Sequence, residues 1–238
     1  MAQQGFAPIG TGSEWAAREK PFTGVLHGNG HTIRNLFIHR SEGFCIGLVG
    51  LLGSGGIVCN LKLLDVTVMG GKGVGSLVGA NLDSIVTGCQ VSGNVTGTED
   101  VGGLIGGSDF GLSKSQAYCK VTGGKNIGGL AGSCGGISMT TDCLASGEVR
   151  GNRFVGGLVG FNQGKINDSQ AIGNVTGESC VGGLVGKNNC GSGFEGSIIR
   201  CKASCKVIGK SQVGALTGEN EGRISECAVS DPNIAGSI

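Results

Sequence analysis

The three histidines of this chain, His27, His31 and His39, lie near its start. His27 and His31 have the spacing of two zinc ligands on one helical turn, but the glutamate of a His-Glu-x-x-His motif is missing. The intervening glycines also disfavour a helix, whereas Asn29-Gly30 is typical of a tight turn. We therefore expect a turn here and no metal or cofactor site.

Two carboxylates facing one substrate would make the chain a polysaccharide-cleaving enzyme. The acids instead look scattered, with no cluster that recurs in register: Asp65, Glu99, Asp100, Asp142, Glu148, Asp168 and Glu178. Glycine-rich runs such as 102–106 lack the Lys-Ser/Thr ending of a phosphate loop. We expect no catalytic residues and no enzymatic activity, with a polysaccharide-degrading β-helix enzyme as a lesser alternative.

Eleven cysteines, an odd number, leave at least one thiol unpaired. In the repeat alignment described below, cysteine interchanges with serine at one position: Cys89, Ser115, Cys143, Ser169, Cys201 and Cys227. At another it interchanges with glycine: Gly93, Cys119, Gly147, Gly173 and Cys205. Such exchange indicates small inward-facing residues rather than ligands. Cys201 and Cys205 are too far apart on one strand for a bridge, while Cys201 and Cys227 fall on adjacent repeats, where a bridge is conceivable. We expect mostly free thiols, as in a reducing cytosol or an anaerobe.

Glycine dominates the composition, at 51 of 238 residues, and aromatic residues make up 4%. Since 39% of residues are apolar, the chain can fold, but its core must consist of small aliphatic side chains. A net charge of +1 gives no reason to expect nucleic acid or an anionic membrane as partner. The sequence has no apolar run long enough to insert into a membrane and no signal peptide at its start. We expect it to be a piece of a longer protein.

A Gly-x-Leu-x-Gly pattern recurs every 26 to 32 residues along the chain. Its leucines are Leu48, Leu77, Leu104, Leu130, Leu158, Leu184 and Leu216. Nine residues before each leucine after the first is a valine: Val68, Val95, Val121, Val149, Val175 and Val207. Four residues earlier is a small or aliphatic residue: Leu64, Val91, Ala117, Ala145, Ala171 and Ala203. This block has a constant length, so the variation must lie in one loop per repeat, the longest around residues 187–196.

Within the block, residues 89–97 alternate between apolar and polar, which predicts a half-buried strand with Val91 and Val95 inward. Residues 101–106 are apolar without alternation and predict a second, more buried strand with a glycine bend. A third short strand is expected at 164–169. Asparagine recurs four residues after the leucine, at a turn where stacked side chains can form a ladder; it stands at Asn81, Asn162, Asn188 and Asn220.

One such repeat cannot bury its own apolar face, so we expect the repeats to stack as coils about 4.8 Å apart. The fold class is therefore all-β: a single-chain parallel β-solenoid of about seven coils, with the leucines in one buried column. A propeller would need repeats of about 40 residues. We assign residues 1–40 to an N-terminal cap and lead-in coil, with Phe6, Trp15 and Phe22 as bulky capping residues, and 41–238 to the solenoid. At the other end, Pro232 is expected to block strand pairing.

The runs 155–160 and 181–186 (Val-Gly-Gly-Leu-Val-Gly) and 169–177 resemble the GLUG repeat, a family of Gly-Leu-any-Gly arrays. The lead-in at 21–36 resembles the segment that opens such arrays, and the resemblance spans about residues 6–230. It implies a bacterial or archaeal surface or secreted protein, often a large adhesin, and no chemistry in the repeats themselves.

These patterns lead us to expect a non-catalytic structural or binding rod of a surface adhesin. Its partners would be a cell-surface glycan or protein receptor and further domains of a longer protein, bound through loops or the outward polar rows. The outward rows of the regular strand are Gln90, Gln116, Leu144, Gln170 and Lys202, and Thr96, Thr122, Arg150, Thr176 and Ile208. The alternative is a phage tail fibre or spike in a virion, which mostly free cysteines would suit.

Overall fold

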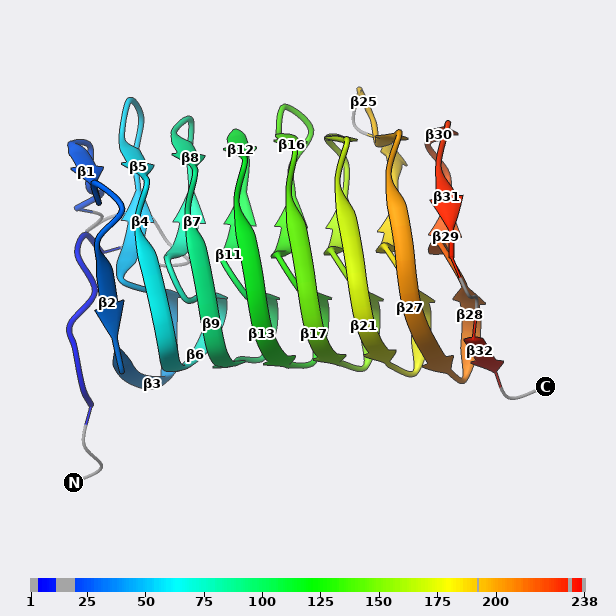
Figure 1. Ribbon diagram of the computed structural model, residues 1–238, viewed down its shortest axis with the longest axis horizontal. Coiled ribbons are helices and arrows are strands. Elements are labelled where there is room, and N and C mark those ends of the chain that lie inside the picture. The colour runs from blue at the N-terminus through cyan, green and yellow to red at the C-terminus, as the bar shows by residue number, and fades with distance from the viewer. Residues whose placement is uncertain (1–3, 12–19, 192, 231–232, 237–238) are drawn as a thin grey trace.

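The chain forms one elongated stack of coils, with strands of successive coils side by side (Figure 1). The computed structural model describes residues 4–11, 20–191, 193–230 and 233–236. The described part contains strands and no helix, and its three large sheets are built from parallel pairs. The predicted parallel β-solenoid of about seven turns is therefore confirmed. Trp15 and Pro232, which we expected to help cap the two ends, lie outside the described residues.

Each regular coil carries four strand segments, one on each face of the rod. The short-strand face is an eight-stranded sheet with one three-residue strand from each coil. Its strands, in spatial order, are β1 (Val25–His27), β5 (Ile57–Cys59), β8 (Ile85–Thr87), β12 (Gly111–Ser113), β16 (Met139–Thr141), β20 (Lys165–Asn167), β26 (Ser197–Ile199) and β30 (Arg223–Ser225). The short strand expected at 164–169 is confirmed as β20.

The long-strand face holds the alternating block of each repeat. Its strands are β2 (Thr32–Arg34), β3 (Phe37–Ile46), β6 (Lys62–Gly75), β9 (Gln90–Thr96), β13 (Gln116–Thr122), β17 (Leu144–Arg150), β21 (Gln170–Thr176), β27 (Lys202–Gly209), β31 (Ala228–Val229) and β32 (Asn233–Gly236). Val91 and Val95 are fully buried, as predicted. β3 crosses residue 40, so the lead-in belongs to the same continuous stack.

The run at 101–106 is divided between two further faces, which corrects our prediction of a single strand. The bulge face, joined to the long-strand face through β6, contains β10 (Glu99–Gly102), β14 (Lys125–Gly128), β18 (Arg153–Gly156), β22 (Ser179–Gly182) and β28 (Ser211–Gly214). The Asn face contains β4 (Val49–Leu52), β7 (Val78–Asn81), β11 (Ile105–Ser108), β15 (Ala131–Cys134), β19 (Val159–Asn162), β23 (Val185–Asn188) and β29 (Thr217–Asn220). The corner between β10 and β11 is so tight that a Cβ on Gly102 would lie 2.0 Å from the carbonyl oxygen of Ile105.

The repeated leucines form the predicted buried column at this corner. Five of them are fully buried: Leu77, Leu104, Leu130, Leu158 and Leu184. Their backbones are linked from coil to coil, as in the 2.8 Å bond from the Leu158 amide to the Leu184 carbonyl. Leu216, in the last complete coil, is only partly buried.

The block has a constant length in five copies, but the first copy contains one extra residue. Leu63, not Leu64, pairs with Val91 and is buried, and the register shifts before Val66 pairs with Gly93. Asp65 occupies the bulge with a φ of 58°, and its amide donates to the Ser92 hydroxyl. Our alignment of Leu64 with the inward residues was therefore wrong, because the extra residue in the bulge lengthens the block by one, so that counting four residues back from Val68 stops one short of Leu63.

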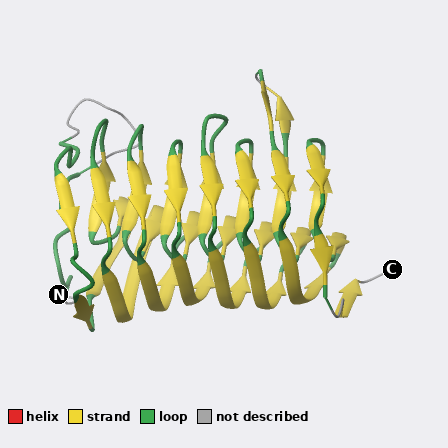
Figure 2. Ribbon diagram, turned by 45° about the horizontal axis from the view of Figure 1, so that its top comes forward, coloured by secondary structure: helices red, strands yellow, loops and turns green. Residues whose placement is uncertain are grey.

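The longest repeat contains the predicted excursion. β24 (Cys190–Gly191) and β25 (Phe194–Glu195) pair as an antiparallel hairpin that projects beyond the rod (Figure 2). At the hairpin base the Gly196 amide donates to the Asn189 carbonyl at 2.9 Å. The loop is thus an insertion that leaves the coil intact.

The described part of the N-terminal segment lies along the first coil. Gly5 forms an isolated bridge with Ile38, Ile9 with Val49, and Phe22 with Leu52. Phe22 packs against the core, whereas Phe6 is 42% exposed. The segment therefore covers backbone edges of the first coil mainly by pairing, and Phe22 is the bulky residue that closes the core.

Candidate functional site

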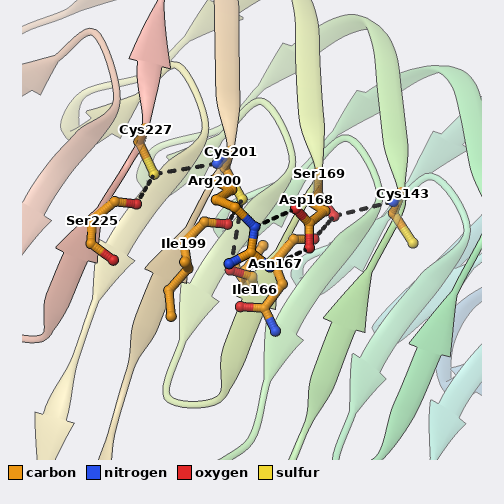
Figure 3. Close-up of polar contacts among 10 residues, drawn as sticks. All are labelled: Cys143, Ile166, Asn167, Asp168, Ser169, Ile199, Arg200, Cys201, Ser225 and Cys227. Carbon is orange, nitrogen blue, oxygen red and sulfur yellow. Dashed lines mark hydrogen bonds and ion pairs between the residues drawn. The ribbon is translucent and has the colours of Figure 1, made fainter.

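Six residues stack in one line where the short-strand face turns into the long-strand face. We call this line the corner column: Cys89, Ser115, Cys143, Ser169, Cys201 and Cys227. Figure 3 shows its last four members. Their backbone sits in a bend, so their amides need a partner outside the sheet ladders.

For the amides of Cys89, Cys143 and Cys201, the side chain of the next coil supplies that partner: Ser115, Ser169 and Cys227 respectively. The Ser169 hydroxyl donates to the Asn167 carbonyl at 2.7 Å and accepts the Cys143 amide of the preceding coil at 3.1 Å. The Cys227 thiol does the same, with the Ser225 carbonyl at 3.3 Å and the Cys201 amide at 3.4 Å (Figure 3). Only a short side chain that both donates and accepts fits this role, which refines our interpretation of Ser/Cys exchange as simple core filling.

The residue just before each member of the corner column has left-handed backbone and faces solvent. We call these six residues the surface column: Gly88, Lys114, Asp142, Asp168, Arg200 and Glu226, with φ values of 49–66°. The Arg200 guanidinium donates two hydrogen bonds of 2.7 Å to the carboxylate of Asp168 in the preceding coil. These bonds lower the pKa of the Asp168 carboxyl. The column is thus a row of exposed polar side chains with both signs of charge.

Two of the acids that we described as scattered do lie in register. Thr141 pairs with Asn167, so Asp142 and Asp168, the next residues, occupy equivalent positions on neighbouring coils. Sequence inspection missed this pair because we aligned the block and not the turn before it. Asp168 is already held by Arg200 on an exposed surface, so the pair does not form the enclosed two-carboxylate site of a glycosidase.

The bulge face is named for a row of residues that have positive φ and are skipped by the register pairing: Cys45, Gly73, Asp100, Asn126, Phe154, Cys180 and Gln212. Asn126 donates to the Asp100 carboxylate at 2.8 Å. Burial nevertheless raises the pKa of Asp100.

A hollow of about 370 Å³ lies next to this row, where Gly73, Ala80 and Gly107 have small or no side chains. At equivalent positions of a later coil, Phe154 and Phe161 lie against each other, with ring centroids 5.7 Å apart. At the rim of the hollow, Glu99 contacts Lys125 at 2.7 Å and Lys72 at 3.4 Å, so its carboxylate is already engaged and its pKa is lowered.

The long-strand face carries its outward side chains in rows, as we expected, with exposed apolar residues such as Ile172 and Ile208 among the polar ones. Register pairing places the outward side chains in the two predicted rows, as where Gln116 pairs with Gln90 and Thr122 with Thr96. A third outward row carries the Tyr118 ring, 38% exposed, whose hydroxyl donates to Gln116 at 2.9 Å. The face could therefore contact a partner along several coils.

An exposed apolar hollow of about 580 Å³ lies on the short-strand face. Ile85 and Met139 flank it, and Gly111 between them leaves it open. The hairpin insertion covers the adjoining part of this face, where a Cβ on Gly136 would lie 2.1 Å from the Phe194 ring.

Most cysteines are buried, as expected for inward positions. The free thiols are Cys59, Cys89, Cys119, Cys134, Cys143, Cys180, Cys190, Cys201, Cys205 and Cys227. Burial raises the pKa of Cys119 and of Cys143 to about 12. Cys190, in the hairpin, is exposed.

The histidine segment forms a turn, as predicted. Asn29 and Gly30 both have positive φ, and the His31 amide donates to the Gly28 carbonyl at 2.7 Å. The His27 ring accepts the Asn29 amide. Within the described ranges, no three His, Cys, Asp or Glu side chains gather in a way that could hold a metal ion.

The predicted asparagine ladder forms between three consecutive coils. Asn162 donates to Asn188 and Asn188 donates to Asn220, both at 2.8 Å. Ser108 and Cys134 occupy the same position in two other coils and interrupt the row. Asn162 and Asn188 are fully buried and Asn220 is exposed, so the ladder stabilises the coil corner from inside and reaches the surface at its last member.

Comparisons with known proteins place this chain beside segments of much longer ones. It is 41% identical over 102 residues to Halomucin of Haloquadratum walsbyi, covering 43% of this chain and 1% of that protein. It is 40% identical over 80 residues to a putative Gly-rich membrane protein of Evansella cellulosilytica, covering 32% of this chain and 9% of that protein. The matched stretches thus span a small part of these curated relatives.

No protein-family model matches the chain, so the GLUG resemblance stays a prediction. No solved structure matches the chain either. The described residues include no helix that is both long and apolar enough to cross a membrane.

Proposed function

We propose that this chain is a non-catalytic rod segment of a large cell-surface protein. The in-register stacking of its coils supports this proposal most directly, because such a stack lengthens by about 4.8 Å for every added repeat without changing its sides. Two relatives support the surface location: one is named Halomucin and the other a putative Gly-rich membrane protein. The rod would hold functional parts away from the cell.

Location is tested on intact cells with antibodies against the purified chain. We expect labelling without permeabilisation, and removal of the epitope by protease added outside the cells. A cytosolic protein labelled in parallel controls for lysis. If labelling requires permeabilised cells, the surface assignment is wrong.

The absence of catalysis is part of the proposal. The in-register acids Asp142 and Asp168 lie on an exposed corner, and the Asp168 carboxylate is already paired with the Arg200 guanidinium. Incubating the purified chain with a panel of acidic and neutral polysaccharides should release no reducing ends and no unsaturated products. Activity that disappears in Asp142→Asn would contradict the proposal.

We further propose that the long-strand face is the surface through which the rod attaches to a glycan or protein. Its outward rows are in register over several coils, and the exposed side chains of Tyr118 and Ile172 lie in the row next to the glutamines. The double variant Tyr118→Ser/Ile172→Ser should weaken binding of the purified chain to cell envelopes by about tenfold. The matched control is Ile85→Ser/Met139→Ser on the short-strand face. Equal loss in both variants would contradict this assignment.

A further inference from the structure

Cys201 and Cys227 are the two consecutive cysteines of the corner column. In the preceding coils cysteine alternates with serine, so that Cys89, Cys143 and Cys201 are separated by Ser115 and Ser169. The residues that follow the pair, Lys202 and Ala228, are parallel partners, so Cys201 and Cys227 stand at equivalent places on adjacent coils.

The geometry of this pair suits a covalent link. Adjacent parallel strands are about 4.8 Å apart, within the Cα separation of about 4.4–6.8 Å that disulfides use. The Cys227 sulfur points back at the preceding coil, 3.4 Å from the Cys201 amide nitrogen (Figure 3). Each thiol otherwise makes only weak hydrogen bonds to carbonyls, at 3.3–3.6 Å.

The coil that carries Cys227 also packs less completely than its neighbour. Val213, Leu216 and Ile224 are only partly buried, whereas the equivalent residues of the coil before them are fully buried: Val181, Leu184 and Ile198. In this chain the coil therefore gains less stability from burial, and a cross-link would restrain it.

We propose that Cys201 and Cys227 form a disulfide that staples the last coil to the preceding one. The oxidant is a low-molecular-weight disulfide, such as oxidised glutathione. The Cys227 thiolate attacks one glutathione sulfur and releases the first glutathione thiol. The Cys201 thiolate then attacks the Cys227 sulfur of this mixed disulfide and releases the second. Two protein thiols are oxidised, and one glutathione disulfide is reduced to two thiols.

Accessibility determines the order of these steps. Cys227 is partly exposed and meets the oxidant first, while Cys201 is fully buried. Burial raises the pKa of Cys201 to about 11, so its thiolate is scarce at neutral pH. The second step is therefore slow and should accelerate as pH rises toward that pKa.

Tryptic cleavage makes the bridge easy to identify. The reduced chain is treated with oxidised glutathione, unfolded with N-ethylmaleimide to block remaining thiols, and digested. Because Arg200, Lys202 and Arg223 are cleavage sites, the bridge appears as the dipeptide 201–202 linked to 224–238, distinct from any link to Cys205. We expect this to be the main linked species, with the thiol titre of the unfolded chain falling from eleven to nine.

Serine replacements provide matched variants that should fold, because serine occupies the same column at Ser115 and Ser169. Cys201→Ser and Cys227→Ser should each abolish the linked peptide, and the ten thiols of each variant should remain free after oxidation. Cys89→Ser and Cys143→Ser should retain the linked peptide. Oxidation should slow hydrogen exchange in β30 and β31 by about tenfold in the parent and not in Cys227→Ser. If no 201–227 link forms, or if other pairs dominate, the proposal is wrong. Equal exchange in the oxidised and reduced parent would likewise overturn the stapling role.

Discussion

At the scale of single residues, this fold depends on polar side chains that satisfy backbone and side-chain groups inside a thin core. Asn188 is fully buried; it accepts from Asn162 and donates to Asn220 and to the Gly196 carbonyl. A buried polar group left without a partner costs about 1–3 kcal/mol. One asparagine therefore influences three coils.

We accordingly expect Asn188→Ala to lower the free energy of unfolding by about 2–3 kcal/mol, because it removes the acceptor of the buried Asn162 amide and the donor to the buried Gly196 carbonyl. Asn94→Ala, at an exposed position of β9, is the control and should change stability by less than about 0.5 kcal/mol. Denaturant titration followed by circular dichroism measures both. Equal effects of the two substitutions would show that the ladder contributes nothing specific.

At the scale of elements, the coil is defined by its corners, and loops are inserted between them. Asn189 and Gly196 stand where Gln163 and Gly164 stand one coil earlier, as their matching backbone bonds show. The six residues of the hairpin between them are additional to the coil. The same logic explains the bulge at Asp65, which adds a residue and leaves the core columns aligned.

Deleting residues 190–195 should therefore join Asn189 to Gly196 with little effect on the fold. We expect the melting temperature to stay within about 3 °C of the parent, because the base of the hairpin is already closed by a hydrogen bond. Deleting residues 170–175, an equally long piece of β21, should prevent folding. A hairpin deletion that unfolds the chain would show that Phe194 on Gly136 is essential packing.

At the scale of the whole molecule, buried thiols connect stability to pH. Burial raises the pKa of Cys89, Cys134, Cys201 and Cys205 from 9.0 to about 11, and of Cys119 and Cys143 to about 12. The unfolded chain loses these protons at lower pH than the folded one. The contribution of the buried, protonated thiols to the free energy of unfolding is thus complete below pH 9 and is lost as pH rises toward 11–12.

We expect the free energy of unfolding to fall steeply above pH 9, by up to about 1.4 kcal/mol per pH unit for each buried thiol. The double variant Cys89→Ser/Cys143→Ser should show a shallower fall over this range, since serine does not titrate there and is native to the corner column. Denaturant titrations at several pH values, under reducing conditions, provide the measurement. Identical slopes for parent and variant would refute the linkage.

The sequence by itself determined the solenoid, because a residue type repeated at a constant interval must stack on its own copies once coils pair in parallel. The leucine column, the inward valines, the Asn ladder between Asn162 and Asn220 and the hairpin insertion followed from spacing alone. Only the tertiary structure decided where the chain bends, because a bend depends on local φ values that many residue types can adopt. It divided the run at 101–106 between two faces, put Leu63 in place of Leu64, and brought Asp142 beside Asp168 in the surface column. The tertiary structure also places the Cys227 sulfur next to the Cys201 amide, because the turn before a corner residue sets the direction of its side chain.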